Sequence, residues 1–174
     1  MEDIMHSSKR VMILAAIVVF VLGTLAHFVY DWSGQNSFIG LLTPVNESTW
    51  EHMKLLFFPM LIIGTAVWLY LRKDFPCIGF SLLAGLLAST ALIPVLFYTY
   101  QGILGFTVMA VDIAIFYISV IAAFFIAYKN ACQCPSKNKK VLLVLITVLT
   151  AFAFFWFTYH PPALGIFANP ELTK

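Results

Sequence analysis

The sequence predicts an all-α membrane protein, a five-transmembrane-helix bundle in which residues 1–174 form a single domain. Two observations predict this class. Of the 174 residues, 61% are hydrophobic and only 10% are charged, whereas soluble domains average about 25% charged residues. Five segments are also apolar over about the 20 residues that a helix needs to cross a bilayer. This composition excludes a soluble enzyme, a disordered chain and a disulfide-stapled secreted module.

The five predicted spans differ in their sequence features. The first is an uninterrupted apolar run that is longer than the apolar core of a signal peptide, about 7–15 residues. The second begins with polar residues and contains Pro59, which should kink it. The third carries small residues at four-residue intervals, Ser81, Gly85 and Ser89, which favour close helix packing and a place at the bundle centre. The fourth span precedes a basic loop and the fifth follows it, and both are apolar throughout their central part. The predicted spans are residues 11–30, 49–71, 75–98, 106–128 and 141–159.

Basic residues are distributed unevenly between the two sides of these spans. All except Lys54 and Lys174 fall on the side of the N-terminus: Lys9, Arg10, Arg72, Lys73, Lys129, Lys137, Lys139 and Lys140. Because loops rich in Lys and Arg stay in the cytoplasm, the sequence predicts a cytoplasmic N-terminus and an outer C-terminus. Cys77, Cys132 and Cys134 then face the cytoplasm, where we expect reduced thiols and no zinc site.

Polar and ionisable residues gather at the outer ends of all five spans. They are His27, Asp31, Glu47, Ser48, Glu51, His52, Lys54, Tyr98, Gln101, Asp112 and His160. Asp112 lies about seven residues inside the fourth predicted span, and an ionised carboxylate at that depth is costly unless it is paired, hydrated or bound to a metal. The sequence therefore predicts a polar site in the outer leaflet.

Imidazole and carboxylate groups suit zinc, so His27, His52, Asp112 and His160 are the predicted metal ligands. Glu51 is the candidate general base and Ser48 a second catalytic candidate. The residues predicted to contact substrate are Asp31, Glu47, Lys54, Tyr98 and Gln101.

Structural roles compete with these assignments. Ser48 and Glu51 have the spacing of a capping box, and Glu47 suits a helix N-terminus. Lys54 either extends toward the interface or pairs with Glu51, and Asp112 either binds a cation or pairs with a histidine.

Four stretches have the character of motifs. They are P-V-N-E-S-T-W-E-H-M-K-L-L-F-F-P-M at residues 44–60 and the shorter runs 27–34, 97–102 and 159–162. They resemble the motifs of a small, uncharacterised family of bacterial five-span membrane proteins. The resemblance implies a five-helix fold in the bacterial inner membrane, and no reaction. A weaker similarity, in residue types alone, links the outer cluster to intramembrane zinc hydrolases of the ceramidase and adiponectin-receptor kind.

Two functions from different classes follow. The first is a metal-dependent hydrolase that acts on a lipid or lipid-linked substrate, because the site lies at headgroup depth. The second is a protein that binds or transports a cation or a small amine, with Asp112 as the ion or proton site. The lipid bilayer is the expected partner, nucleic acid is not, and a homo-oligomer remains open. A purely structural role leaves Asp112 unexplained.

The orientation can be tested by cysteine labelling in intact cells. In a cysteine-free background, a single cysteine at position 137 should react with a membrane-impermeant maleimide only after the cells are permeabilised. A single cysteine at position 36, in the first outer loop, should react in intact cells and serves as the control. Labelling of position 137 from outside would reject the predicted orientation.

Overall fold

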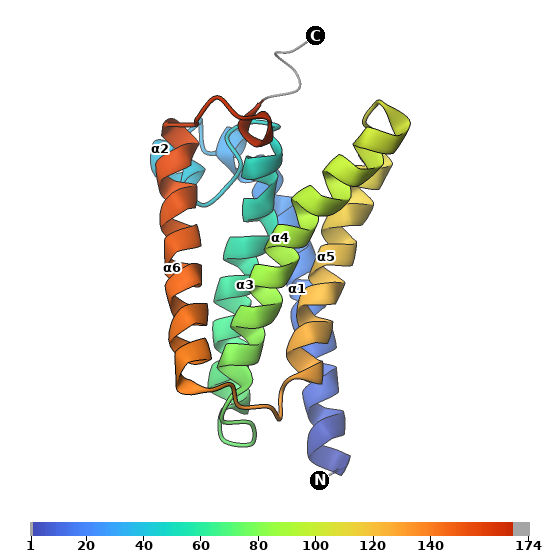
Figure 1. Ribbon diagram of the computed structural model, residues 1–174, viewed down its shortest axis with the longest axis vertical. Coiled ribbons are helices and arrows are strands. Elements are labelled where there is room, and N and C mark those ends of the chain that lie inside the picture. Colours follow the sequence, from blue (N-terminus) through green and yellow to red (C-terminus); the bar gives the residue numbers. More distant parts are fainter. Residues whose placement is uncertain (1, 169–174) are drawn as a thin grey trace.

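The computed structural model describes the backbone of residues 2–168 and the side chains of residues 8–168, and every regular element in this part of the chain is a helix. Five long helices run alternately up and down, so that α1 begins at one end of the bundle and α6 ends at the other (Figure 1). The elements are α1 (Glu2–Trp32), α2 (Ser37–Gly40), α3 (Thr49–Leu71), α4 (Ile78–Leu104), α5 (Met109–Lys129), α6 (Lys137–Tyr159) and the 3₁₀ turn η1 (Gly165–Phe167).

The outer surface of the bundle matches a lipid environment. Each long helix exposes large apolar side chains, for example Leu14, Ile62, Val95, Ile121 and Leu149, and all five are long and apolar enough to cross a bilayer. A soluble monomer rarely exposes so much contiguous apolar surface. The prediction of an all-α chain with five membrane-length helices is confirmed.

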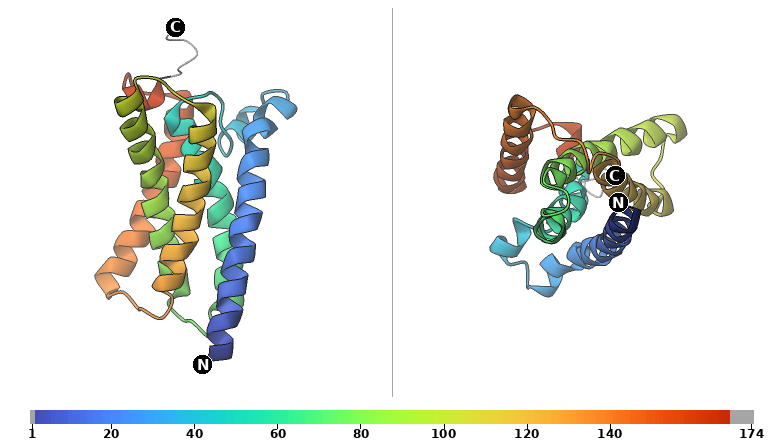
Figure 2. Two further views of the ribbon diagram at one scale, coloured as in Figure 1. Left: turned by 90° about the vertical axis from the view of Figure 1, so that its right-hand side faces the viewer. Right: turned by 90° about the horizontal axis from the view of Figure 1, so that it is seen from below.

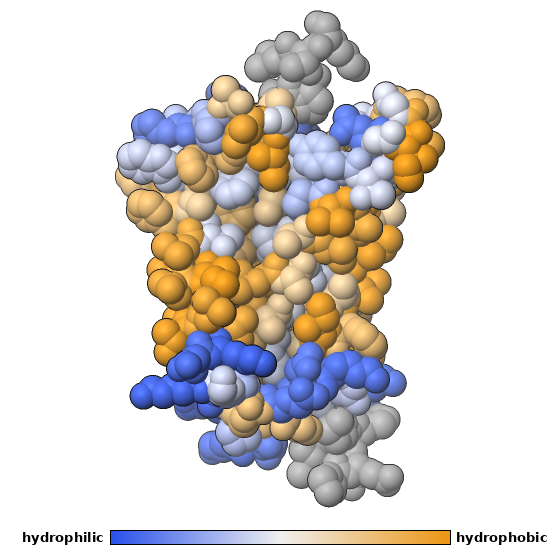
Figure 3. Space-filling view, in the orientation of Figure 1, coloured by the Kyte–Doolittle hydropathy of each residue, from blue (hydrophilic) through white to orange (hydrophobic). Residues whose placement is uncertain are grey.

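The two ends of the bundle differ in charge. The basic residues that the sequence assigns to one side all lie at the end formed by the start of α1, the α3–α4 connection and the α5–α6 connection. Figure 3 shows this basic end as a blue band below the apolar surface. The opposite end, called the histidine end here, holds His27, Glu47 and His52.

The most buried helix is α3, not α4. The apolar stretch of α3 that could cross a membrane is 56% buried inside the bundle, and that of α4 is 39% buried. The difference arises because α3 packs against α1, α4, α5 and α6. The expectation that the third span is the most central one was therefore wrong, although α4 packs against α3, α5 and α6. A Cβ on Gly85 would lie 2.2 Å from the carbonyl oxygen of Ala123 in α5, so the backbones of α4 and α5 approach closely there.

A disulfide joins the two connections at the basic end. Cys77 bonds to Cys134 with their Cα atoms 5.2 Å apart, and Cys132 is free and exposed. The hydroxyl of Ser81 donates to the carbonyl of Asn130 at 2.8 Å, which holds the α5–α6 connection against the start of α4. This packing, which spacing does not reveal, corrects the expectation of three reduced thiols. Disulfides are rare in the cytosol, so the bond and the charge bias give opposite orientations.

Candidate functional site

The connection between α1 and α3 is shaped by local sequence. Gly34 has φ +68°, a left-handed conformation that glycine adopts without strain. Asn36 then caps α2, because its side chain accepts hydrogen bonds from the backbone of Phe38 and Ile39. Ser48 caps α3 and accepts from the backbone N–H of Glu51 at 3.4 Å. Two turns and two caps thus return the chain to the start of α3.

A buried ion pair attaches this connection to the bundle. The ammonium of Lys54, which is 0% exposed, donates to a carboxylate oxygen of Glu51 at 2.7 Å. It also contacts the carbonyl of Gly40 at 2.9 Å and that of Thr43 at 3.4 Å, both in the connection. The hydroxyl of Thr158 in α6 lies 2.6 Å away. Lys54 therefore ties α3, α6 and the connection together at one point.

Glu51, the other partner of the ion pair, also attaches the connection to the bundle. Glu51, which is 2% exposed, accepts a hydrogen bond from the backbone N–H of Val45 at 3.0 Å. The phenol of Tyr159 in α6 donates to the carbonyl of Ser37 at 2.6 Å. Glu47 follows these anchored residues directly, so its position at the mouth of the bundle is determined by them.

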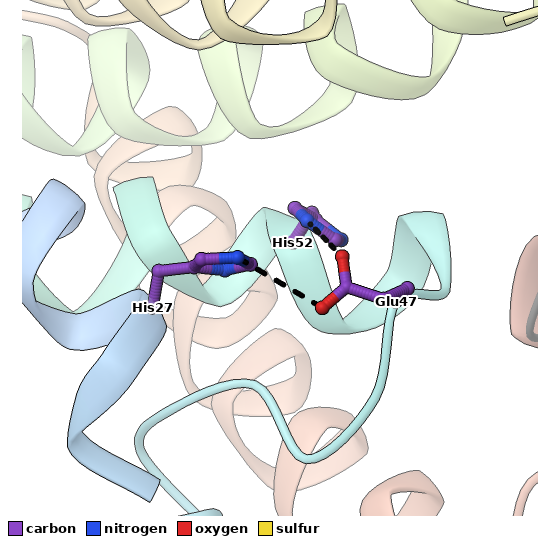
Figure 4. Close-up of side chains that lie close together, drawn as sticks. All are labelled: His27, Glu47 and His52. Carbon is purple, nitrogen blue, oxygen red and sulfur yellow. Dashed lines mark ion pairs between the residues drawn. The ribbon is translucent and has the colours of Figure 1, made fainter. Parts of the chain in front are cut away.

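Glu47 lies between two histidines from different helices. Figure 4 shows His27 on α1 and His52 on α3 pointing toward its carboxylate. The Nε2 of His52 lies 3.3 Å from Oε2, and the Nε2 of His27 lies 3.8 Å from Oε1. One ligand atom from each of the three residues falls within 4.8 Å of the others. Close backbone contact makes this possible, since a Cβ on Gly23 would lie 2.5 Å from the carbonyl oxygen of Leu55.

The hydrogen bond between the His52 ring and the backbone determines which charge must lie between His52 and Glu47. Its Nδ1 is 3.0 Å from the carbonyl of Ser48, and a carbonyl oxygen only accepts, so Nδ1 carries a proton. The Nε2 lone pair then points at a carboxylate and repels it unless a cation separates them. That cation is either a second proton on the imidazole or a metal ion. The same Nδ1–carbonyl contact orients many metal-binding histidines.

The two histidines also affect the pKa of Glu47. The hydrogen bond with His52 lowers the pKa of Glu47, assisted by the positive charge of both histidines, and this outweighs the partial burial that would raise it. The lowered pKa favours the carboxylate anion of Glu47, the form that pairs with a cation.

Two cavities meet at the cluster. One of about 460 Å³ lies between α1 and α5, and one of about 150 Å³ lies between α3, α4 and α5. Both are lined by Glu47, His52 and Asp112. The larger cavity reaches the side of the bundle, where Phe28, Met109, Ile113 and Tyr117 are exposed.

Asp112 is closer to the end of its helix than predicted. Because α5 begins at Met109, Asp112 lies in the first turn instead of seven residues inside, and it is half-buried. The phenol of Tyr100 in α4 donates a hydrogen bond to its carboxylate. The same phenol accepts from the backbone N–H of Val108 at 3.2 Å, so Tyr100 fixes the start of α5.

The structure brings together some of the predicted site residues and separates others. His27, His52 and Glu47 converge, and Asp112 faces the same cavities. His160 is exposed on α6 and stacks on Trp156, and α6 and α1 lie on opposite sides of α3 (Figure 2). The residues that line neither cavity are Asp31, Ser48, Glu51, Lys54, Tyr98, Gln101 and His160.

Sequence reasoning assigned Glu47 to substrate binding and gave Tyr100 no role. Glu47 lies five residues before His52, a spacing that matches no single helix face, because it belongs to the connection and not to α3. The only sequence signal for Tyr100 is its place twelve residues before Asp112 at a helix–helix turn.

The comparisons with known proteins identify the family. The chain belongs to a family of unknown function, DUF6512, whose model matches residues 1–173. No curated protein and no solved structure matches the chain. The resemblance to an uncharacterised family is thus confirmed at the level of the family.

The buried ion pair generates a stability prediction. Lys54→Met leaves the buried Glu51 carboxylate without its ion-pair partner and removes the Lys54 donor from two carbonyl oxygens, so the free energy of unfolding should fall by about 3–5 kcal/mol. Unfolding by SDS titration in mixed micelles measures this. Lys73→Met, at an exposed lysine just after α3, is the control and should change little. An unchanged stability of Lys54→Met would contradict the anchoring role of the pair.

Proposed function

We propose that the protein is a membrane-embedded, metal-dependent hydrolase that acts on a lipid or lipid-linked substrate. One observation carries the proposal: His27, Glu47 and His52 converge at the wall of a cavity that opens between α1 and α5 among apolar side chains. The orientation expected from the basic residues would put this site at the outer face of a bacterial inner membrane.

The ligand set favours zinc. Two ligand atoms of a tetrahedral zinc site, each bonded at about 2.0–2.1 Å, lie about 3.3 Å apart. His52 lies 3.3 Å from one carboxylate oxygen of Glu47 and His27 lies 3.8 Å from the other. One ligand atom from each residue lies within 4.8 Å of the others, so the three side chains would move closer together to complete the geometry. Imidazole and carboxylate ligands without cysteine are typical of catalytic sites, in which three protein ligands leave a fourth position for water.

The residues around the cluster suit hydrolysis. Zinc lowers the pKa of a bound water to about 7 and polarises a carbonyl or phosphoryl oxygen. Asp112 faces the cavity across from His52 and would accept the proton of that water as general base. Tyr100 holds the Asp112 carboxylate in place through its hydrogen bond. Glu51 is occupied by Lys54 and Val45, which makes Asp112 the better candidate.

The shape of the cavity favours a lipid substrate. Its outer wall consists of large apolar side chains on α1 and α5, including Phe28, Ile113 and Tyr117. Acyl chains would enter from the bilayer between these helices, and the polar headgroup would reach the histidines. A water-soluble substrate would gain nothing from such a lateral opening.

A second function is favoured by the acidic character of the cavity. Glu47 and Asp112 line it, and no lysine or arginine does, so an organic amine or a cation would also be attracted. In that case Asp112 is the primary binding group and zinc is not required. Metal analysis separates the two functions.

Metal content provides the first test. The purified protein should retain about one zinc per chain after dialysis, and His52→Ala should lose most of it, since each lost ligand typically weakens a site strongly. His160→Ala is the matched control, because His160 is exposed on α6 away from the cluster. Elemental analysis of wild type and both variants decides. Equal zinc in all three proteins, or none in the wild type, would rule out the metal site.

Asp112→Asn provides the second test. The change keeps a hydrogen-bond partner for Tyr100 and removes the base, so metal content should persist while turnover falls by at least about 100-fold. The assay uses zinc-loaded protein in vesicles of bacterial polar lipids, with cleaved lipids quantified by mass spectrometry. If Asp112→Asn retained wild-type turnover, Asp112 would not be the base.

A further inference from the structure

A third cavity lies in the half of the bundle nearer the basic end. It has a volume of about 420 Å³ and is enclosed by α3, α4 and α6. Its walls are almost entirely apolar, and Gly64, Trp68 and Phe80 contribute to them. None of its lining residues belongs to the histidine site, so it is independent of the proposed function.

The loose packing of α6 leaves this cavity open. Only 17% of the apolar stretch of α6 is buried inside the bundle. The N-terminal end of α6 diverges from the other helices (Figure 2). Only Val144 of α6 lines the cavity. In a membrane, such an apolar groove between helices is filled by acyl chains, because water there would have no polar partners.

Two cations lie on the aromatic walls of the groove. The guanidinium carbon of Arg72 lies 5.5 Å from the ring centroid of Trp68, and the ammonium of Lys140 lies 5.1 Å from that of Phe80. Neither cation forms an ion pair among the described residues, although Asp74 lies close to Arg72 in the chain. Arg72 directly follows α3 and Lys140 lies in the first turn of α6, so both charges belong to the basic end, which Figure 3 shows as a blue band below the apolar surface.

We infer that this groove is a binding site for one anionic phospholipid. The acyl chains lie between α6 and the α3–α4 pair, and the phosphate is held by Arg72 and Lys140. Basic pockets between transmembrane helices bind anionic headgroups in this way. A zwitterionic lipid fits the groove equally well but gains less from the two cations.

Native mass spectrometry of delipidated protein in detergent tests the site. Titration with phosphatidylglycerol should show one tightly bound lipid, held more strongly than phosphatidylcholine. Each cation near a membrane surface contributes about fivefold in affinity. The double variant Arg72→Gln/Lys140→Gln should therefore weaken phosphatidylglycerol binding by about 30-fold and leave phosphatidylcholine binding nearly unchanged.

Two further variants make the test specific. Lys9→Gln/Lys129→Gln removes the same charge from the same end, but these lysines lie on α1 and α5, so affinity should not change. Gly64→Leu fills the groove, since a Cβ there has no neighbour closer than 3.9 Å, and it should weaken both lipids. The inference is overturned if phosphatidylglycerol binds no more tightly than phosphatidylcholine. It is also overturned if the Lys9/Lys129 variant loses as much affinity as the Arg72/Lys140 variant.

Discussion

The histidine end of this bundle depends on one ammonium group. Lys54 is fully buried in a bundle whose core is mostly apolar, and it contacts a carboxylate, two backbone carbonyls and a hydroxyl from three separate segments. A buried charge without partners would cost several kcal/mol, so these segments are confined to the places where they satisfy it. The connection that carries Glu47 is one of them. The geometry of the candidate metal cluster thus follows from an ion pair that does not belong to it.

The same arrangement explains why the site combines polar chemistry with access from lipid. The ion pair and the cap of α3 satisfy the polar backbone of the connection on the side of α6. On the other side, between α1 and α5, the histidines and Asp112 remain half-buried beside exposed apolar side chains. In a bilayer, ionisable groups that face a cavity and pair with one another mark functional sites. Glu51 and Glu47, four residues apart, therefore differ in their surroundings: Glu51 is buried in the ion pair with Lys54, and Glu47 is the carboxylate of the candidate metal cluster.

Much of this could be predicted from the sequence because it depends on composition and periodicity. Hydropathy alone gives five membrane-length helices, and the small residues of α4 predict its close contact, here with α5. The sequence does not show which helices and connections lie side by side in the folded bundle. His160 has the same residue type and the same expected depth as His27, yet α3 separates their helices. The disulfide between Cys77 and Cys134 depends on two connections that meet only after the helices have packed. Tyr100 acts through a contact across a turn between helices.

X-ray absorption at the zinc edge, on protein loaded with one equivalent of zinc, tests metal binding at the histidine end most directly. Binding by His27, Glu47 and His52 predicts a first shell of nitrogen and oxygen at about 2.0–2.1 Å, with the outer-shell scattering of two imidazole rings. A shell of sulfur at about 2.3 Å would place the metal at the cysteines of the basic end and contradict binding by the histidines. A first shell of oxygen only, without imidazole scattering, would contradict it equally, because His27 and His52 would then take no part in binding.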